Sequence, residues 1–221
     1  MADIVIFGAS PSAEVAKTYL EAHSSHRIVG FTVDDRYATR EQFCGLPLVP
    51  WDRLEQFFPP SQVQLLGPIS YRRMNEFRRD RYLEGKERSY RFASFIHPNS
   101  QIYTDDIGEH CFILEANVVQ PHVKIGNNVI LWGANWIGHH CVIGDHCFFS
   151  SQIGIAGGTR IGERCFVGGQ AGVIEGLTIG DACLLSAGVF VSRDIPAGSV
   201  VRRGSVDKIA PFPSSRMRGL L

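Results

Sequence analysis

The sequence lacks a net charge, because its 22 Lys and Arg residues balance its 22 Asp and Glu residues. Without a positive excess, no electrostatic argument favours nucleic acid or an anionic membrane as a partner. Its apolar runs fall short of the ~20 residues that a membrane-spanning helix needs, and its first residues lack the basic segment of a secretory signal. We therefore expect a cytoplasmic protein with neither a nucleic-acid nor a membrane partner.

The six cysteines include no Cys-x-x-Cys pair, so the usual spacing of zinc ligands is missing. A chain of this length buries roughly 70% of its unfolded surface, enough to fold without a metal or a disulfide. Five cysteines stand two positions before a residue that heads a repeat, where a small side chain would face the interior of a coil: Cys111, Cys141, Cys147, Cys165 and Cys183. We interpret them as small, reduced, buried hydrophobes and expect no metal.

A six-residue period dominates the second half of the sequence. The pair Ile-Gly recurs every 18 residues, from Ile107-Gly108 to Ile179-Gly180. Two further six-residue steps lie inside each interval, so that fifteen consecutive hexads, ending at Pro196, begin with an aliphatic residue or, once, with phenylalanine. Neither the period of a helix nor that of a plain strand gives this pattern. A triangular coil with three short parallel strands per turn does, so the sequence predicts a parallel β-helix.

The first 95 residues show a different pattern, in which strands alternate with helices. We predict a strand and a turn over residues 3–8, strands over 27–33 and 63–66, and helices over 13–22 and 71–86. The first helix is expected to be capped at Ser10 or Ser12. This alternation favours a small Rossmann-like α/β domain with a parallel sheet. The predicted organisation is an α/β domain at 1–95, a β-helix at 96–200 and a C-terminal tail at 201–221.

The histidines cluster in the β-helix, and the 18-residue period sorts them into columns. One column, in our interpretation an exposed polar ladder, contains His110, Asn128, His146 and Arg164. His139 differs because it lies one coil before Gly157, whose missing side chain leaves room beside the backbone for a long ligand. The spacing alone leaves two roles open for His139, a catalytic base and a solvated side chain.

The segment IGHHCVIGDH, from Ile137 to His146, lies within fifteen hexads behind an α/β domain. It resembles the bacterial hexapeptide sugar acyltransferases, in particular the sialic-acid O-acetyltransferases and the bacillosamine and perosamine N-acetyltransferases. The resemblance implies a left-handed β-helix, a sugar-binding α/β domain, a homotrimer, and acetyl-CoA in the groove between adjacent helices. It also implies that His139 is the catalytic base, which removes a proton from the sugar amine or hydroxyl as it attacks the thioester.

The same resemblance implies roles for residues around His139, although the chain differs from the family pattern at some of them. His140 stands where relatives carry an Asp or Glu that orients the histidine, so either Glu115 or no acid takes that role. Asn135 is the substitute for an asparagine that relatives often carry at the position of Trp132. The residues expected to contact acetyl-CoA are Ala156, Gly157, Ala187, Gly188 and Lys208.

The amino-terminal loop departs from the family as well. Relatives have a glycine-rich turn that receives the phosphate of a nucleotide-sugar. This chain has Gly8-Ala9-Ser10-Pro11 instead, and the proline removes a backbone donor. Asp34 and Asp35 match the acidic pair that meets the nucleoside in relatives, although a strand-ending turn also explains them. A nucleotide-linked sugar is expected to contact Gly8, Ala9, Ser10, Asp34 and Asp35.

These observations favour an acetyl-CoA-dependent sugar acetyltransferase with a histidine base and direct acyl transfer. Its expected reaction is N-acetylation of a nucleotide-linked amino-deoxy sugar for bacterial surface polysaccharide such as lipopolysaccharide. The alternative within the class is O-acetylation of a sialic-acid-like or other sugar hydroxyl. The alternative from another class is a non-catalytic trimeric β-helix scaffold. A carbonic-anhydrase-like metal site is poorly matched, since His122 and His140 stand one coil apart.

Overall fold

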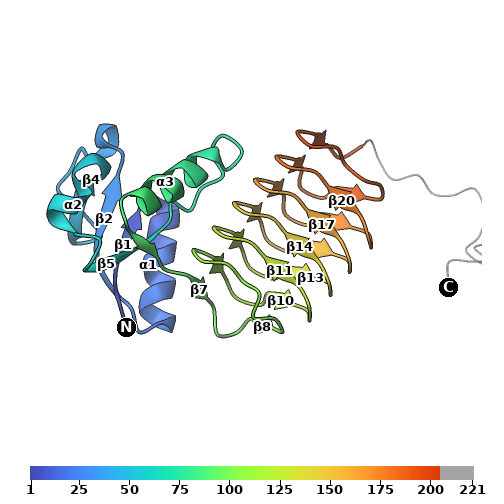
Figure 1. Cartoon of the computed structure of the whole chain (residues 1–221), viewed down its shortest axis with the longest axis horizontal. Helices are drawn as coiled ribbons and strands as arrows, with labels where there is room; N and C mark the ends of the chain where they lie inside the picture. Colours follow the sequence, from blue (N-terminus) through green and yellow to red (C-terminus); the bar gives the residue numbers. More distant parts are fainter. Residues whose placement is uncertain (205–221) are drawn as a thin grey trace, which may run out of the picture.

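The computed structural model describes residues 1–204, in which an α/β domain packs against one face of a long triangular coil (Figure 1). Lys208, predicted to contact the cosubstrate, and residues 205–221 of the predicted tail lie outside the described residues. None of the helices within residues 1–204 combines the length and apolar character that a bilayer crossing requires.

The α/β domain is built on one six-stranded sheet. In the order of the sheet its strands are β3 (Gln42–Phe43), β4 (Leu46–Pro50), β2 (Arg27–Val33), β1 (Asp3–Phe7), β5 (Val63–Leu66) and β6 (Arg91–Phe92). All neighbours are parallel except β3 and β4. The helices are α1 (Pro11–His23), α2 (Leu54–Phe57) and α3 (Glu76–Glu87), with 3-10 turns η1 (Asp35–Tyr37) and η2 (Trp51–Arg53). Helix α1 packs on the face of the sheet that carries Ile4 and Ile6, and α3 packs on the opposite face with Val5 and Phe7. In Figure 1 both helices lie between the strands and the coil.

The three predicted strands are present as β1, β2 and β5, and both predicted helices form, but their starts differ. Helix α1 begins at Pro11 with Ser10 in the N-cap position, although the Ser10 hydroxyl bonds that of Ser12 rather than the helix backbone. Helix α3 begins at Glu76, later than predicted. The three residues before it, 73–75, adopt positive φ angles of 52°, 51° and 64°, a left-handed conformation that a helix cannot continue.

The coil has three flat faces of parallel strands. The first face contains β7 (Phe95–Ile96), β9 (Phe112–Ile113), β12 (Ile130–Leu131), β15 (Phe148–Phe149), β18 (Phe166–Val167), β21 (Leu184–Leu185) and β23 (Val200–Val201). The second contains β8 (Gln101–Ile102), β10 (Val118–Val119), β13 (Trp136–Ile137), β16 (Gly154–Ile155), β19 (Gly172–Val173) and β22 (Phe190–Val191). The third contains β11 (Lys124–Ile125), β14 (Val142–Ile143), β17 (Arg160–Ile161) and β20 (Thr178–Ile179).

The register of these strands follows the hexads. Val119 pairs with Ile137, and Ile137 pairs with Ile155, so each turn of the coil takes 18 residues. The last turn is shorter, because Leu184 pairs with Val200. The predicted parallel β-helix is therefore observed, with one irregular turn at its carboxyl end.

The interior of the coil holds the residue that heads each hexad and the residue two positions before it. The five cysteines predicted to face inward are fully buried in this core, which confirms that prediction. Their thiols donate to backbone carbonyls of the next coil, as Cys147 Sγ does to the oxygen of Gly162 at 3.0 Å. The thiols thus act as small core side chains with a weak polar contact.

The first face of the coil is covered by the α/β domain. Phe112 and Phe148 of this face belong to the same apolar cluster as Ile4 of β1 and Leu20 of α1. Because both domains contribute to one buried cluster, separating them would expose apolar surface to water. The two units therefore pack as a single body.

The polar column predicted to be an exposed ladder is buried, and that prediction is wrong. We call it the docking column; its members are His110, Asn128, His146 and Arg164, of which the first three are 4%, 0% and 6% exposed. The 18-residue period does stack these residues at one corner of the coil. It carries no information about the α/β domain that covers this corner.

Candidate active site

His139 lies at the corner between β13 and β14, which we call the histidine corner (residues 138–141), and its side chain is exposed. Its backbone N–H donates to Gln120 Oε1 at 2.9 Å. On the next coil stands Gly157, where an added Cβ would lie only 2.5 Å from Cε1 of the His139 ring. The imidazole therefore rests against the Gly157 backbone, and only glycine accommodates it there.

A second imidazole orients the first. His139 Nδ1 lies 3.2 Å from His140 Nδ1, with the two rings nearly perpendicular at 83°. One of the two nitrogens carries the hydrogen of this bond, and when it is that of His139, its Nε2 is left as the acceptor. The His140 ring also contacts the ring of His122 one coil earlier, with centroids 4.6 Å apart.

Two predicted partners of His139 lie elsewhere. Glu115 is at the corner between the first and second faces, where it accepts a hydrogen bond of 2.7 Å from the hydroxyl of Tyr19 in α1. Burial raises the pKa of Glu115, but the Tyr19 hydrogen bond, a backbone hydrogen bond and the nearby His97 and His23 together lower it below its usual value. Glu115 therefore joins the coil to the α/β domain, and within one chain it lies at a different corner from His139.

Asn135 is 1% exposed and lies inside the coil. Its amide nitrogen donates to the Trp132 oxygen, and its Oδ1 accepts from the N–H of Ile153 at 2.9 Å. These bonds satisfy backbone groups in the interior, where no substrate reaches. The expectation of a catalytic role for Asn135 is corrected: it stands two positions before a hexad head, the same place as the buried cysteines.

The residues predicted to contact the cosubstrate fall at two corners. Ala156 and Gly157 follow β16 and lie beside the histidine corner, where the Gly158 N–H donates to the His139 oxygen at 2.8 Å. Ala187 and Gly188 follow β21 and lie at the corner between the first and second faces. A single chain therefore does not bring these two pairs together.

A pocket of about 480 Å³ opens in the α/β domain at the carboxyl ends of β1 and β2. Four of the predicted substrate contacts line it: Gly8, Ala9, Ser10 and Asp34. Its opposite wall is the segment Pro68–Arg72 with Phe77 of α3. Asp35 lies in η1 and is not among the lining residues. Ligands of parallel α/β sheets bind at this end of the strands.

The charges of this pocket differ from those that the sequence suggests. Asp34 is paired, since its Oδ1 accepts from Arg81 Nε at 2.9 Å. Arg40 and Arg72 also line the pocket, with their guanidinium groups over the rings of Phe43 and Phe77. Sequence analysis missed both arginines, although the loss of backbone donors at Pro11 was a reason to look for side-chain cations nearby.

Gln120 was also missed. It stands 18 residues before Gly138, so the period places it one coil below the histidine corner. Within residues 1–204, no group of three or more His, Cys, Asp or Glu side chains is arranged to hold a metal ion.

The chain has known relatives in sequence and structure. Residues 158–193 match the family described as hexapeptide repeat of succinyl-transferase. One similar solved structure is a mutant of perosamine N-acetyltransferase from Caulobacter crescentus in complex with CoA and GDP-perosamine. Its sequence is 25% identical to this chain and its TM-score is 0.81; the match covers 90% of this chain and 93% of that chain. The acetyltransferase domain of PglB from Neisseria gonorrhoeae, in complex with acetyl coenzyme A, is 22% identical, with a TM-score of 0.76 and coverages of 90% and 94%.

WeeI from Acinetobacter baumannii is 19% identical to the chain, with a TM-score of 0.77 and coverages of 90% and 96%. No curated protein sequence matches. These similarities extend over both domains. The predicted fold, a small Rossmann-like α/β domain followed by a left-handed parallel β-helix, is confirmed.

Proposed function

We propose that this chain, which belongs to the hexapeptide-repeat sugar acyltransferases, N-acetylates a nucleotide-linked amino-deoxy sugar. Membership makes the chain an acyltransferase that uses acetyl-CoA, as the sequence predicts, and argues against a non-catalytic scaffold. One observation carries the proposed site: an exposed imidazole held against a glycine backbone, at His139 and Gly157.

The two substrates approach the site from different parts of the molecule. Acetyl-CoA lies along the histidine corner, where Ala156 and Gly157 leave the backbone accessible to its thioester. The nucleotide-linked sugar occupies the pocket of the α/β domain, and Arg40 and Arg72 contact its diphosphate. Guanidinium groups form strong charge-assisted bonds with phosphate, which offsets the donor lost at Pro11.

The reaction is a direct transfer. The amine nitrogen of the sugar attacks the thioester carbonyl while His139 Nε2 accepts the proton that the amine loses. The tetrahedral intermediate then collapses, the C–S bond breaks, and the thiolate of CoA takes the proton back from the imidazolium. The products are an amide and free CoA, and no covalent acyl-enzyme forms.

His140 is a positioning residue in this scheme. Its Nδ1, 3.2 Å from that of His139, accepts the hydrogen that fixes the tautomer of the base. Relatives are expected to use a carboxylate at this place, and an imidazole supplies the acceptor without the negative charge.

The working enzyme is a homotrimer in this proposal. The second face carries exposed aromatic side chains at Trp136 (51%) and Phe190 (74%), an arrangement that suits contact with another copy. Ala187 and Gly188 of one copy would then approach the histidine corner of the next. The sugar product serves bacterial surface polysaccharide, and the free thiols within the coil fit a reducing cytoplasm.

The test is a transfer assay with acetyl-CoA and a panel of acceptors that includes nucleotide-linked amino sugars and sialic-acid-like hydroxyl acceptors. Thiol release and product mass are followed. We expect amide products only from the amino sugars. Substitution His139→Ala should lower kcat by about a thousandfold, the scale of a lost general base.

His122→Ala is the matched control, because it changes an exposed histidine of the same corner on the preceding coil. It should keep wild-type kcat. Ester products alone would replace N-acetylation by O-acetylation, and a His139→Ala enzyme with near-normal kcat would remove His139 from its assigned role.

A further inference from the structure

Arg78 of α3 is a buried cation without an anion. It is 1% exposed, and burial lowers its pKa to about 9, so it stays charged at neutral pH. Among the described residues, every acceptor of its guanidinium group is a carbonyl or amide oxygen. A buried charge costs several kcal/mol unless its hydrogen bonds compensate. Such a residue calls for a physical reason beyond helix formation.

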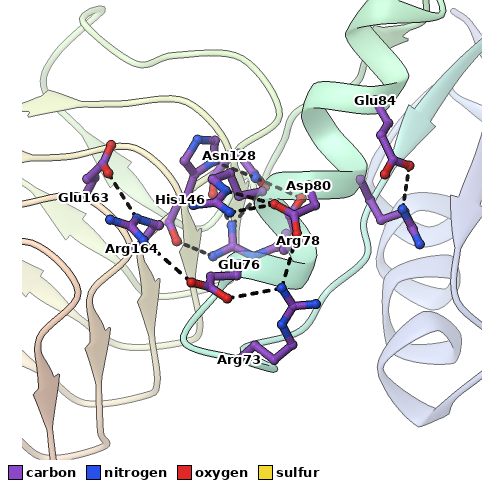
Figure 2. Close-up of polar contacts among 11 residues, drawn as sticks. Arg73, Glu76, Arg78, Asp80, Glu84, Asn128, His146, Glu163 and Arg164 are labelled. Atoms are coloured by element: carbon purple, nitrogen blue, oxygen red, sulfur yellow. Dashed lines mark hydrogen bonds and ion pairs between the residues drawn. The ribbon is translucent and has the colours of Figure 1, made fainter. Parts of the chain in front are cut away.

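The guanidinium group joins α3 to two coils at the docking column (Figure 2). Nη1 donates to both the backbone oxygen and Oδ1 of Asn128, the latter at 2.9 Å. Nη2 donates to the His146 oxygen at 2.6 Å and to the Cys147 oxygen at 3.1 Å. Nε donates to the Ser70 oxygen and Nη2 also donates to Asn75 Oδ1, so all three nitrogens of this planar group are engaged, which a lysine could not reproduce.

The docking column receives one continuous segment of the α/β domain, from Gly67 to Arg78. At its start, the Gly67 N–H donates to Nε2 of the buried His110 at 2.9 Å. Near its end, Asn75 Nδ2 donates to the oxygens of Arg164 and Cys165 at 3.2 and 3.0 Å. Four successive coils therefore hold this segment through polar bonds.

Between those attachments the segment forms a wall of the pocket. Pro68, Ile69, Ser70 and Arg72 all line it. Arg78 reaches this wall directly, since its Nε donates to the Ser70 oxygen at 3.1 Å. The three consecutive residues with positive φ, 73–75, lie between the wall and α3. Non-glycine residues persist in this conformation only where surrounding contacts hold them.

We infer that Arg78 and the docking column fix the position of the acceptor-binding pocket along the axis of the coil. The sugar amine then meets the histidine corner at a defined place. Arg78 is a positioning residue, since it acts through the pocket wall and not on the reacting atoms. The expected effect on the KM for the nucleotide-sugar rests on the proposed function. The attachment of segment 67–78 stands without it.

The test compares Arg78→Met, which keeps the apolar stem, with Arg78→Lys, which keeps the charge and loses the planar fork. Arg79→Met is the matched control, because Arg79 is the next residue of α3 and, among residues 1–204, its side chain bonds only Asp80. Three quantities are measured: KM for the nucleotide-sugar, KM for acetyl-CoA, and hydrogen exchange of the amides in residues 67–75.

Arg78→Met should raise the KM for the nucleotide-sugar about tenfold, because misplaced substrates lose that much or more, and leave the KM for acetyl-CoA unchanged. Amides 67–75 should exchange faster. Arg78→Lys should lie between this variant and the wild type, and Arg79→Met should match the wild type. A purely structural role would instead affect both KM values or neither.

Unchanged exchange together with an unchanged acceptor KM would overturn the inference, as would an equal rise of both KM values. If Arg78→Met does not fold, Arg78→Lys and Asn75→Ala decide by the same measurements. If the wild type transfers acetyl to no nucleotide-sugar, the proposed function fails, and calorimetric binding of UDP and GDP with the exchange data still tests the positioning role.

Discussion

Two corners of the same coil carry histidines at the same place in the hexad, with opposite surroundings. His140, in the histidine corner, and His122, one turn earlier in the same column, have φ angles of 58° and 64° and are exposed. His110 and His146, in the docking column, have φ angles of 59° and 62° and are buried. The repeat therefore fixes the backbone of these residues, while the neighbouring domain decides their chemistry.

At the covered corner the imidazoles are held neutral. Burial lowers the pKa of His110 to about 3 and that of His146 to about 4, and the charge of Arg78 acts in the same direction. At the open corner the imidazoles face solvent, where a substrate can reach them. One kind of residue thus stabilises an interface at one corner and is available for proton transfer at the other.

Among the substitutions that test this comparison, the largest effect is expected at Gly157, where the open corner depends on a missing side chain. Gly157→Ala would place a Cβ 2.5 Å from Cε1 of His139, and the ring must turn away. Because a side chain moves and the backbone stays, stability should change little. A displacement of this size costs about a hundredfold in kcat, which steady-state kinetics measures.

Gly154→Ala serves as the control for that substitution. An added Cβ at Gly154 meets no atom of the described residues, 1–204, within 4 Å, although this glycine lies on the same turn of the coil as Gly157. It should leave kcat unchanged. Equal losses in the two variants would mean that the histidine corner tolerates no change of backbone freedom, and the argument from ring position would fail.

The next effect concerns the covered corner and acid. His146 has a pKa of about 4 in the folded chain and a higher one, ~6.5, when unfolded. Between pH 4 and pH 6.5 the unfolded chain therefore binds a proton at His146 that the folded chain does not. The contribution of neutral His146 to folding stability is complete above pH 6.5 and is lost as the pH falls through 4. Because one pKa unit is worth about 1.4 kcal/mol, we expect His146 to contribute a loss on the order of 3 kcal/mol across this window, as measured by chemical denaturation.

His146→Asn should reduce that dependence, because Asn128 already occupies the equivalent position one coil earlier and does not titrate. The charged groups that act on His146 are Arg78 and Arg79, which lower its pKa, and Asp145 and Glu163, which raise it. Equal pH slopes in the wild type and His146→Asn would refute the assignment.

The smallest effect is expected from the partner of the base. His140→Ala removes the imidazole 3.2 Å from His139 but keeps the backbone, because alanine already adopts the same left-handed turn at positions 116, 134 and 182. Loss of a tautomer-fixing acceptor should lower kcat about tenfold, with KM for acetyl-CoA unchanged. A kcat equal to that of His122→Ala would show that His139 needs no orienting partner.

The sequence predicted the coil because its information is periodic. Heads such as Ile137 and buried thiols such as Cys147 repeat at fixed intervals, and each confirms the register of the others. The same register predicts that His139 lies beside Gly157, as the structure shows. The register also indicates that Asn135 faces inward, since this residue shares the hexad position of the cysteines, whereas the family pattern places an asparagine near the base.

Contacts between the domains were beyond reach of the same reasoning. His110 and His146 look like solvated histidines in the repeat, and nothing periodic indicates that Arg78 would lie against them. Helix α3 has few apolar residues, so its buried side could not be identified from amphipathicity. Tyr19, which bonds Glu115, comes from a helix whose docking direction the sequence does not encode locally.

The docking column ends at the turn that contains Arg164, while the triangular coil, a prism in shape, continues for further turns toward its carboxyl end. Domain attachment and prism length are therefore separable properties. An insertion of one full turn near Gly180 would lengthen the prism by ~4.8 Å, one strand spacing, and would move neither the pocket nor the base. Evolution or design could vary the reach of the prism in such steps, provided that each insertion restores the phase of the hexads.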